Sequence, residues 1–104
     1  MSVEKVNDQG FSESLNSNEK VVVKYFANWC GSCKLFAPKY RRLSEDDRFK
    51  GITFLDVNAE ENEEARKLAG VDNLPYFAVF KNGELVEGMA TNKEENVVEL
   101  LEKL

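Results

Sequence analysis

A run of apolar and β-branched residues, Val21 to Phe26, leads within a few residues into a helical pattern that opens with two cysteines. Near-continuous runs of this kind are typical of a central strand covered on both faces, as in α/β sheets. The chain is therefore expected to fold around a buried strand that delivers both thiols to the start of a helix. This junction constrains the fold class and the chemistry together.

The junction reads Trp29-Cys30-Gly31-Ser32-Cys33-Lys34, and it holds the only two cysteines of the chain. Two thiols separated by two residues on the first turn of a helix can close a small disulfide ring. The unpaired N–H groups and the dipole of the helix N-terminus stabilise a thiolate, so the pKa of the first thiol is expected to be low. Reversible thiol–disulfide exchange is the chemistry that such a pair performs.

Other uses of two cysteines explain the sequence less well. A structural zinc site usually takes four Cys or His ligands, whereas the chain has two Cys and no His. A disulfide that closes so short a loop adds little stability. Two thiolates can hold Cu(I), but such carriers usually place Met where this chain has Asn28. We therefore expect no metal and no organic cofactor, only the redox-active disulfide between Cys30 and Cys33.

Length and charge narrow the setting. The chain has 104 residues, enough for a single domain over residues 1–104. A net charge of −5 argues against nucleic-acid binding, and no apolar stretch approaches the ~20 residues that insert into a membrane. Residues Met1 to Asp8 lack the apolar core and cleavage site of a signal peptide. A cytoplasmic monomer is expected, with a trimmed exported precursor as the alternative.

Apolar periodicity and turn residues predict an α/β fold with the element order β-α-β-α-β-α-β-β-α. The expected elements are an extended start with Val3 and Val6, a helix over Asp8–Leu15, a strand over Lys20–Phe26, a helix over Cys33–Asp46 kinked by Pro38, a strand over Ile52–Val57, a helix over Glu60–Ala69, strands over Tyr76–Lys81 and Glu84–Met89, and a last helix from Asn92. Asn82-Gly83 predicts a type I′ hairpin turn. Ala65, Leu68 and Ala69 are expected to face the core.

Two separated motifs resemble the landmarks of the thioredoxin family, in the family's order. The first is Ala27–Lys34 followed by Ala37-Pro38, and the second is Val71–Tyr76 followed by Phe80–Gly83. The resemblance covers essentially the whole chain. It implies the thioredoxin fold, a central mixed five-stranded sheet flanked by four helices. It also implies a protein-disulfide reductase that passes electrons to disulfides in other proteins.

The resemblance implies a role for each matching residue. Cys30 would be the exposed nucleophile that attacks a target disulfide, and Cys33 would resolve the mixed disulfide. Trp29 would shield the sulfurs and offer an apolar contact to substrate. Pro75 is expected to follow a cis bond, which would aim the Leu74 backbone at an incoming peptide.

The strand before the cysteines departs from the family pattern. Most thioredoxins carry a buried Asp six residues ahead of the first Cys, where this chain has Lys24. The family often has a Lys on the next strand, where this chain has Asp56. Because a lone buried charge is costly, we hypothesise that Lys24 and Asp56 pair behind Cys33 with reversed polarity. The alternative is that Lys24 extends to the edge of the protein. A charged Lys24 cannot accept the proton of Cys33. We therefore expect the resolving step to be slower than in thioredoxins that carry the buried Asp.

Two smaller departures lie beside the thiols. Ser32 stands where the commonest motif has Pro, and its hydroxyl could donate to a Cys30 thiolate and make the disulfide a better oxidant. Tyr76 stands where thioredoxins usually carry Thr, and its ring either narrows the substrate groove or packs inside. The predicted site comprises the catalytic pair Cys30 and Cys33, the supporting residues Trp29, Gly31, Ser32, Lys34, Lys24 and Asp56, and the substrate-binding residues Leu74, Pro75 and Tyr76.

The expected partners follow from the same resemblance. The chain has no flavin- or nicotinamide-binding glycine motif, so electrons must come from another protein. A thioredoxin reductase is the expected donor, and a membrane electron conduit is the alternative for an exported protein. The competing functions are a thioredoxin-like oxidase or isomerase and a module that docks partners through this fold.

Overall fold

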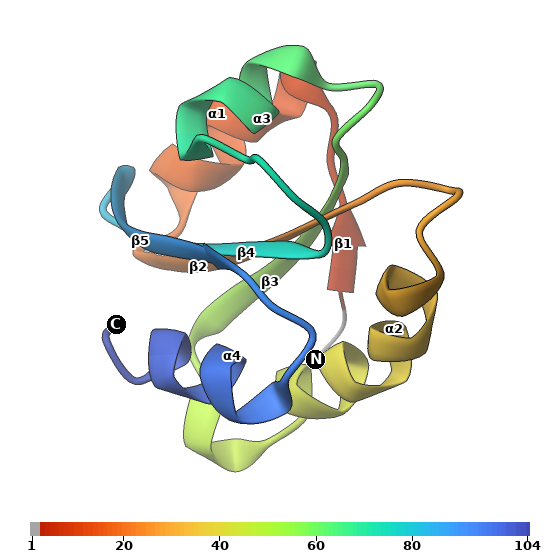
Figure 1. Ribbon diagram of the computed structural model, residues 1–104. Coiled ribbons are helices and arrows are strands. Elements are labelled where there is room, and N and C mark those ends of the chain that lie inside the picture. The colour runs from red at the N-terminus through yellow and green to blue at the C-terminus, as the bar shows by residue number, and fades with distance from the viewer. Residues whose placement is uncertain (1–2) are drawn as a thin grey trace.

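The computed structural model describes residues 3–104, which form a mixed sheet between two pairs of helices (Figure 1). The elements are β1 (Val3–Lys5), α1 (Asp8–Ser17), β2 (Lys20–Phe26), α2 (Gly31–Ser44), a short 3-10 helix (Asp47–Phe49), β3 (Ile52–Asn58), α3 (Glu63–Ala69), β4 (Tyr76–Lys81), β5 (Glu84–Ala90) and α4 (Glu94–Leu101). This arrangement confirms the predicted fold class and element order. Within residues 3–104, no helix is both long and apolar enough to cross a membrane.

The strand β2 lies at the centre of the sheet, whose order is β1-β3-β2-β4-β5. It pairs in parallel with β3 and antiparallel with β4, and residues 21–25 are buried. The hairpin between β4 and β5 turns at Asn82 and Gly83, which both have positive φ (53° and 84°). These are the values that the Asn-Gly pair predicts for a type I′ turn.

The sheet separates two apolar cores, and Figure 1 shows the helices that cover its two faces. Helices α1 and α3 cover one face, and α2 and α4 cover the other. Tyr40 attaches α2 to the sheet, because its buried hydroxyl donates its proton to the carbonyl oxygens of Val22 (3.1 Å) and Leu55 (2.8 Å). Burial raises the pKa of Tyr40 well above its ordinary value, so the hydroxyl remains a donor.

Helix α3 differs from the sequence prediction in its start and in its buried face. It begins at Glu63, three residues after the predicted Glu60, because Asn58 holds the preceding residues in a turn through a bond from the Glu60 N–H to its side-chain oxygen (3.0 Å). The prediction that Leu68 faces the core is wrong, since this side chain is 54% exposed. Ala65 and Ala69 are spaced i,i+4, so both face the core from this short helix. Leu68 lies outside the face that they form.

Gly88 on β5 lies against the ring of Tyr76 on the neighbouring strand β4. A Cβ atom at Gly88 would lie 2.6 Å from the Tyr76 hydroxyl oxygen and 2.8 Å from its Cε1. The ring cannot move away freely, because its hydroxyl donates to the Ala69 carbonyl (3.1 Å) and it packs edge-on against Tyr25. Position 88 therefore requires a residue without a side chain as long as Tyr76 is present.

We expect Gly88→Ala to lower the free energy of unfolding by about 1–3 kcal/mol, the usual cost of overpacking, as measured by urea denaturation. Gly10→Ala in α1 is the matched control, because its Cβ would meet only an oxygen of Asn7 at 3.9 Å. The cost at Gly88 should shrink in a Tyr76→Thr background, which removes the ring. An equal cost in both backgrounds would show that the ring is not the cause.

Candidate active site

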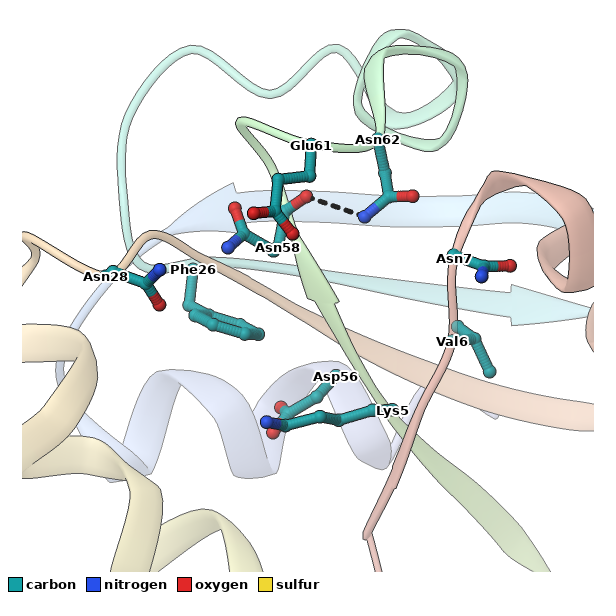
Figure 2. Close-up of a pocket in the computed structure, with 9 residues that line it drawn as sticks. All are labelled: Lys5, Val6, Asn7, Phe26, Asn28, Asp56, Asn58, Glu61 and Asn62. Atoms are coloured by element: carbon teal, nitrogen blue, oxygen red, sulfur yellow. Dashed lines mark hydrogen bonds between the residues drawn. The ribbon is translucent and has the colours of Figure 1, made fainter.

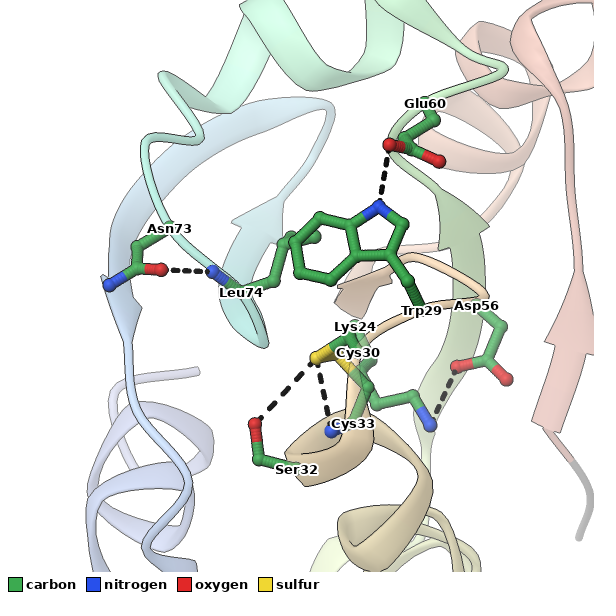
Figure 3. Close-up of a disulfide and its surroundings, with 9 residues drawn as sticks. All are labelled: Lys24, Trp29, Cys30, Ser32, Cys33, Asp56, Glu60, Asn73 and Leu74. Atoms are coloured by element: carbon green, nitrogen blue, oxygen red, sulfur yellow. Dashed lines mark hydrogen bonds and ion pairs between the residues drawn. A yellow bond between two sulfur atoms is a disulfide. The ribbon is translucent and has the colours of Figure 1, made fainter.

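The disulfide between Cys30 and Cys33 lies where β2 leaves the sheet and α2 begins. Cys30 is the N-cap residue of α2, and the Cys33 N–H donates to its Sγ at 3.2 Å. The Ser32 hydroxyl lies 3.6 Å from the same sulfur (Figure 3). A negative charge on the Cys30 sulfur would therefore meet a backbone donor, a hydroxyl and the positive end of a helix.

Both cysteines are buried in this oxidised form. Cys30 is 4% exposed and Cys33 is 3% exposed, so the prediction of an exposed Cys30 is wrong for the disulfide state. The two residues form a small apolar cluster with Ala27, against which Phe26 and Leu74 pack. Leu74 comes from the loop before β4, a distant segment whose contact the local sequence around Cys30 does not reveal.

Trp29 projects from the protein beside the disulfide (Figure 3). Its side chain is 69% exposed, and the indole N–H donates to the Glu60 carboxylate at 2.6 Å. The exposed ring provides the apolar surface that the sequence predicts for contact with a substrate. Glu60 is not predicted as a partner of Trp29, because the sequence pattern places it in a helix.

Lys24 and Asp56 form an ion pair with an Nζ–Oδ1 distance of 3.5 Å. The two residues are neighbours in the parallel register of β2 and β3, and their side chains are 4% and 18% exposed. The pairing that the sequence analysis hypothesised is thus present, and Lys24 does not extend to the edge. Its ammonium also lies 5.2 Å from the Tyr40 ring and 5.8 Å from the Phe26 ring, positions that stabilise a buried cation.

Burial raises the pKa of Asp56, while the Lys24 ammonium opposes this shift. The Oδ1 atom is buried and, within the part of the chain described, accepts no hydrogen bond in addition to the ion pair. Lys5 on β1 flanks the same carboxylate from the other side (Figure 2). Asp56 is therefore held between two lysines on neighbouring strands.

Two adjoining cavities connect this charge pair to its surroundings. One, of about 180 Å³, is lined by Cys33, Lys24 and Asp56, and by the predicted supporting residue Lys34. The other, of about 360 Å³, is lined by polar side chains, among them Lys5 and Asp56 (Figure 2). The ion pair therefore shares a cavity with Cys33, as the sequence predicts.

Gly31, another predicted supporting residue, is the first residue of α2. A Cβ atom added at Gly31 would have no neighbouring atom within 4 Å.

A shallow groove runs past the disulfide on the other side. It has a volume of about 210 Å³ and is lined by Ser32, Asn73, Leu74, Pro75, Ala90, Thr91 and Asn92. The Leu74–Pro75 bond is cis, the isomer that the resemblance implies. Tyr76 is only 8% exposed and belongs to the core beneath α1 and α3, so its ring packs inside and does not narrow this groove. The sequence analysis assigned no role in the groove to Asn73, which lies within the second motif, or to Thr91 and Asn92, which reach the site through the tertiary fold.

The family model for thioredoxin matches residues 2–103. The chain belongs to the thioredoxin family. Thioredoxin-1 of Schizosaccharomyces pombe is 38% identical over 86 residues, which are 82% of this chain and 82% of that protein. The solved thioredoxin of Plasmodium falciparum has a TM-score of 0.87 and 31% identity, covering 96% of this chain and 97% of that chain.

A chain in the crystal structure of a complex of ferredoxin:thioredoxin reductase and thioredoxin f2 has a TM-score of 0.89 and 27% identity, over 98% of this chain and 94% of that chain. Membership of the thioredoxin family and the Cys30–Cys33 disulfide establish the activity together. The protein is a thiol–disulfide oxidoreductase that works by dithiol–disulfide exchange.

Removing the Ser32 hydroxyl should make the disulfide harder to reduce. A hydroxyl at this position that donates to a Cys30 thiolate would stabilise the reduced state, so we expect Ser32→Ala to lower the reduction potential by about 10–30 mV, the equivalent of one modest hydrogen bond. Equilibration with glutathione buffers measures this shift. Ser44→Ala is a suitable control, because that hydroxyl donates to the Arg41 carbonyl at the far end of α2. A potential that is unchanged or higher in Ser32→Ala would contradict the assignment.

Proposed function

We propose that this thioredoxin reduces disulfides in other proteins, with Cys30 as the attacking thiolate and Cys33 as the resolving thiol. The observation that carries the proposal is the position of the Cys30 sulfur. It caps α2, accepts the Cys33 N–H at 3.2 Å, and lies beside the Ser32 end of the groove. Cys33 faces the opposite side, where it lines the cavity with Lys24 and Asp56.

The exchange proceeds in two balanced steps. The Cys30 thiolate attacks one sulfur of the target disulfide, forms a mixed disulfide and releases the other target sulfur as a thiolate. The Cys33 sulfur, after losing its proton, then attacks the Cys30 sulfur and releases the second target thiolate. Two electrons pass to the target, and the protein is left with the Cys30–Cys33 bond.

Lys24 promotes the second step as a positioning residue. Its ammonium is buried in the space that Cys33 lines, so it favours a negative charge on the Cys33 sulfur during the attack. Asp56 balances the cation, and its raised pKa makes its carboxylate a better proton acceptor than an exposed one. In this proposal, Lys24 and Asp56 together replace the buried Asp that most thioredoxins carry at the position of Lys24.

Electrons return to the disulfide from a partner protein. A neighbouring structure contains a reductase in complex with a thioredoxin, which supports a reductase as the donor for this chain also. The cytoplasmic setting and the monomeric state expected from the sequence are part of this proposal.

Replacing each cysteine separately tests the two roles. Cys33→Ser should accumulate a mixed disulfide when mixed with oxidised insulin, because the first step can occur and the second cannot. Cys30→Ser should accumulate none. Non-reducing electrophoresis followed by mass spectrometry identifies the bonded residue. Adducts formed mainly through Cys33 would reverse the assigned roles.

Replacing Lys24 tests the resolving step. We expect Lys24→Met to slow the decay of the mixed disulfide roughly 10-fold, the effect of about 1.4 kcal/mol on the barrier, in stopped-flow single-turnover experiments. Lys39→Met is the matched control, because it removes a cation from the outer face of α2. The rate at which the mixed disulfide forms should change little in either variant. If the mixed disulfide decays equally fast in Lys24→Met and Lys39→Met, Lys24 does not promote the resolving step.

A further inference from the structure

The backbone N–H of Leu74, beside the disulfide, is occupied by a side chain of its own loop. The side-chain oxygen of Asn73 accepts this N–H at 2.9 Å (Figure 3). Asn73 is exposed, and both residues line the groove that ends at Ser32. The bond therefore lies on the surface that a substrate of the proposed exchange must approach.

The other backbone groups around Leu74 show which positions of the loop a peptide could use. The Pro75 carbonyl is already used, since it accepts the Thr91 N–H at 3.1 Å. Within residues 3–104, no protein donor reaches the Leu74 carbonyl. Leu74 itself packs against the two cysteines. A peptide extended along the groove would therefore pair with the backbone N–H and the carbonyl of Leu74, in the manner of an added strand.

We propose that Asn73 is a specificity-determining residue, whose side-chain amide occupies the Leu74 N–H until a peptide carbonyl displaces it. The inference rests on the proposed reduction of protein disulfides and adds a requirement to it. A substrate with a peptide backbone next to its disulfide must displace the Asn73 oxygen before it can bond the Leu74 N–H, so one hydrogen bond is exchanged for another. A small disulfide without peptide groups gains nothing from the displacement and reacts without it.

The hydrogen bond between the Leu74 N–H and the Asn73 side chain is local and exposed, so displacing the Asn73 oxygen costs little free energy. A hydrogen bond of this kind contributes a factor of about 2 to 10 to an equilibrium. The Asn73 amide thus weakens the binding of every peptide substrate by a similar factor. Asn73 therefore reduces the advantage that a peptide backbone gives a substrate over a disulfide without one, whichever side chains the substrate carries.

Steady-state reduction of a peptide with one disulfide, with dithiothreitol as electron donor, tests the inference. Asn73→Ala should lower KM for the peptide about 2- to 10-fold with little change in kcat, because the Leu74 N–H is free from the start. Asn73→Asp keeps an acceptor oxygen and should retain the wild-type KM. Asp72→Ala alters the adjacent exposed residue and should also retain it. For a small aromatic disulfide without peptide groups, Asn73→Ala and wild type should react equally.

Hydrogen exchange at the Leu74 amide provides a second measurement that does not depend on activity. This amide should exchange about 2- to 10-fold faster in Asn73→Ala than in wild type or Asn73→Asp. Equal exchange in all three proteins would overturn the inference, as would an equal KM for the peptide or the same change with the small disulfide. A wild-type protein that reduces no peptide would instead contradict the proposed function, and the exchange rates would still decide whether Asn73 occupies the amide.

Discussion

Burial of the strand β2 on both faces is the constraint on which the rest of the structure depends. Residues 21–25 are inaccessible to water, so each polar group on this strand needs a partner inside the protein. The neighbouring strands β3 and β4 supply the backbone partners, and the Tyr40 hydroxyl binds the Val22 carbonyl from the α2 side. Because α2 is fixed in this way, the cysteines at its first turn have a defined position at the end of the sheet.

The same burial explains the charge pair behind the cysteines. The Lys24 side chain is only 4% exposed, and Asp56 is its cross-strand neighbour. Together with Lys5, the arrangement places two cations and one carboxylate near Cys33 in a chain whose net charge is −5. Salt screens buried charges much less than surface charges. The formal charge of these three groups beside Cys33 is therefore positive, although the net charge of the molecule is negative.

Much of this structure could be predicted from the sequence, because periodicity and strand register are local properties. They predicted the strands and the order of the elements, whereas the pairing of Lys24 with Asp56 was predicted from the departure from the family pattern. The burial of Cys30, the inward ring of Tyr76 and the exposure of Leu68 depend on contacts with distant segments, so the local pattern misjudged or left open each of them. The bond from Leu74 to Asn73 was invisible for another reason, since an exposed asparagine carries no periodic signal.

The two edges of the sheet limit how other chains can associate with this protein. On one side β1 has only three residues, and on the other β5 carries Glu84 and Glu87 and has an irregular register opposite Val79 and Phe80. Short, charged or irregular edges are poor templates for the intermolecular strand pairing that leads to aggregation. The edges of the sheet therefore offer little to an added strand, whereas the loop at Leu74 places a backbone N–H and a carbonyl beside the sulfur atoms.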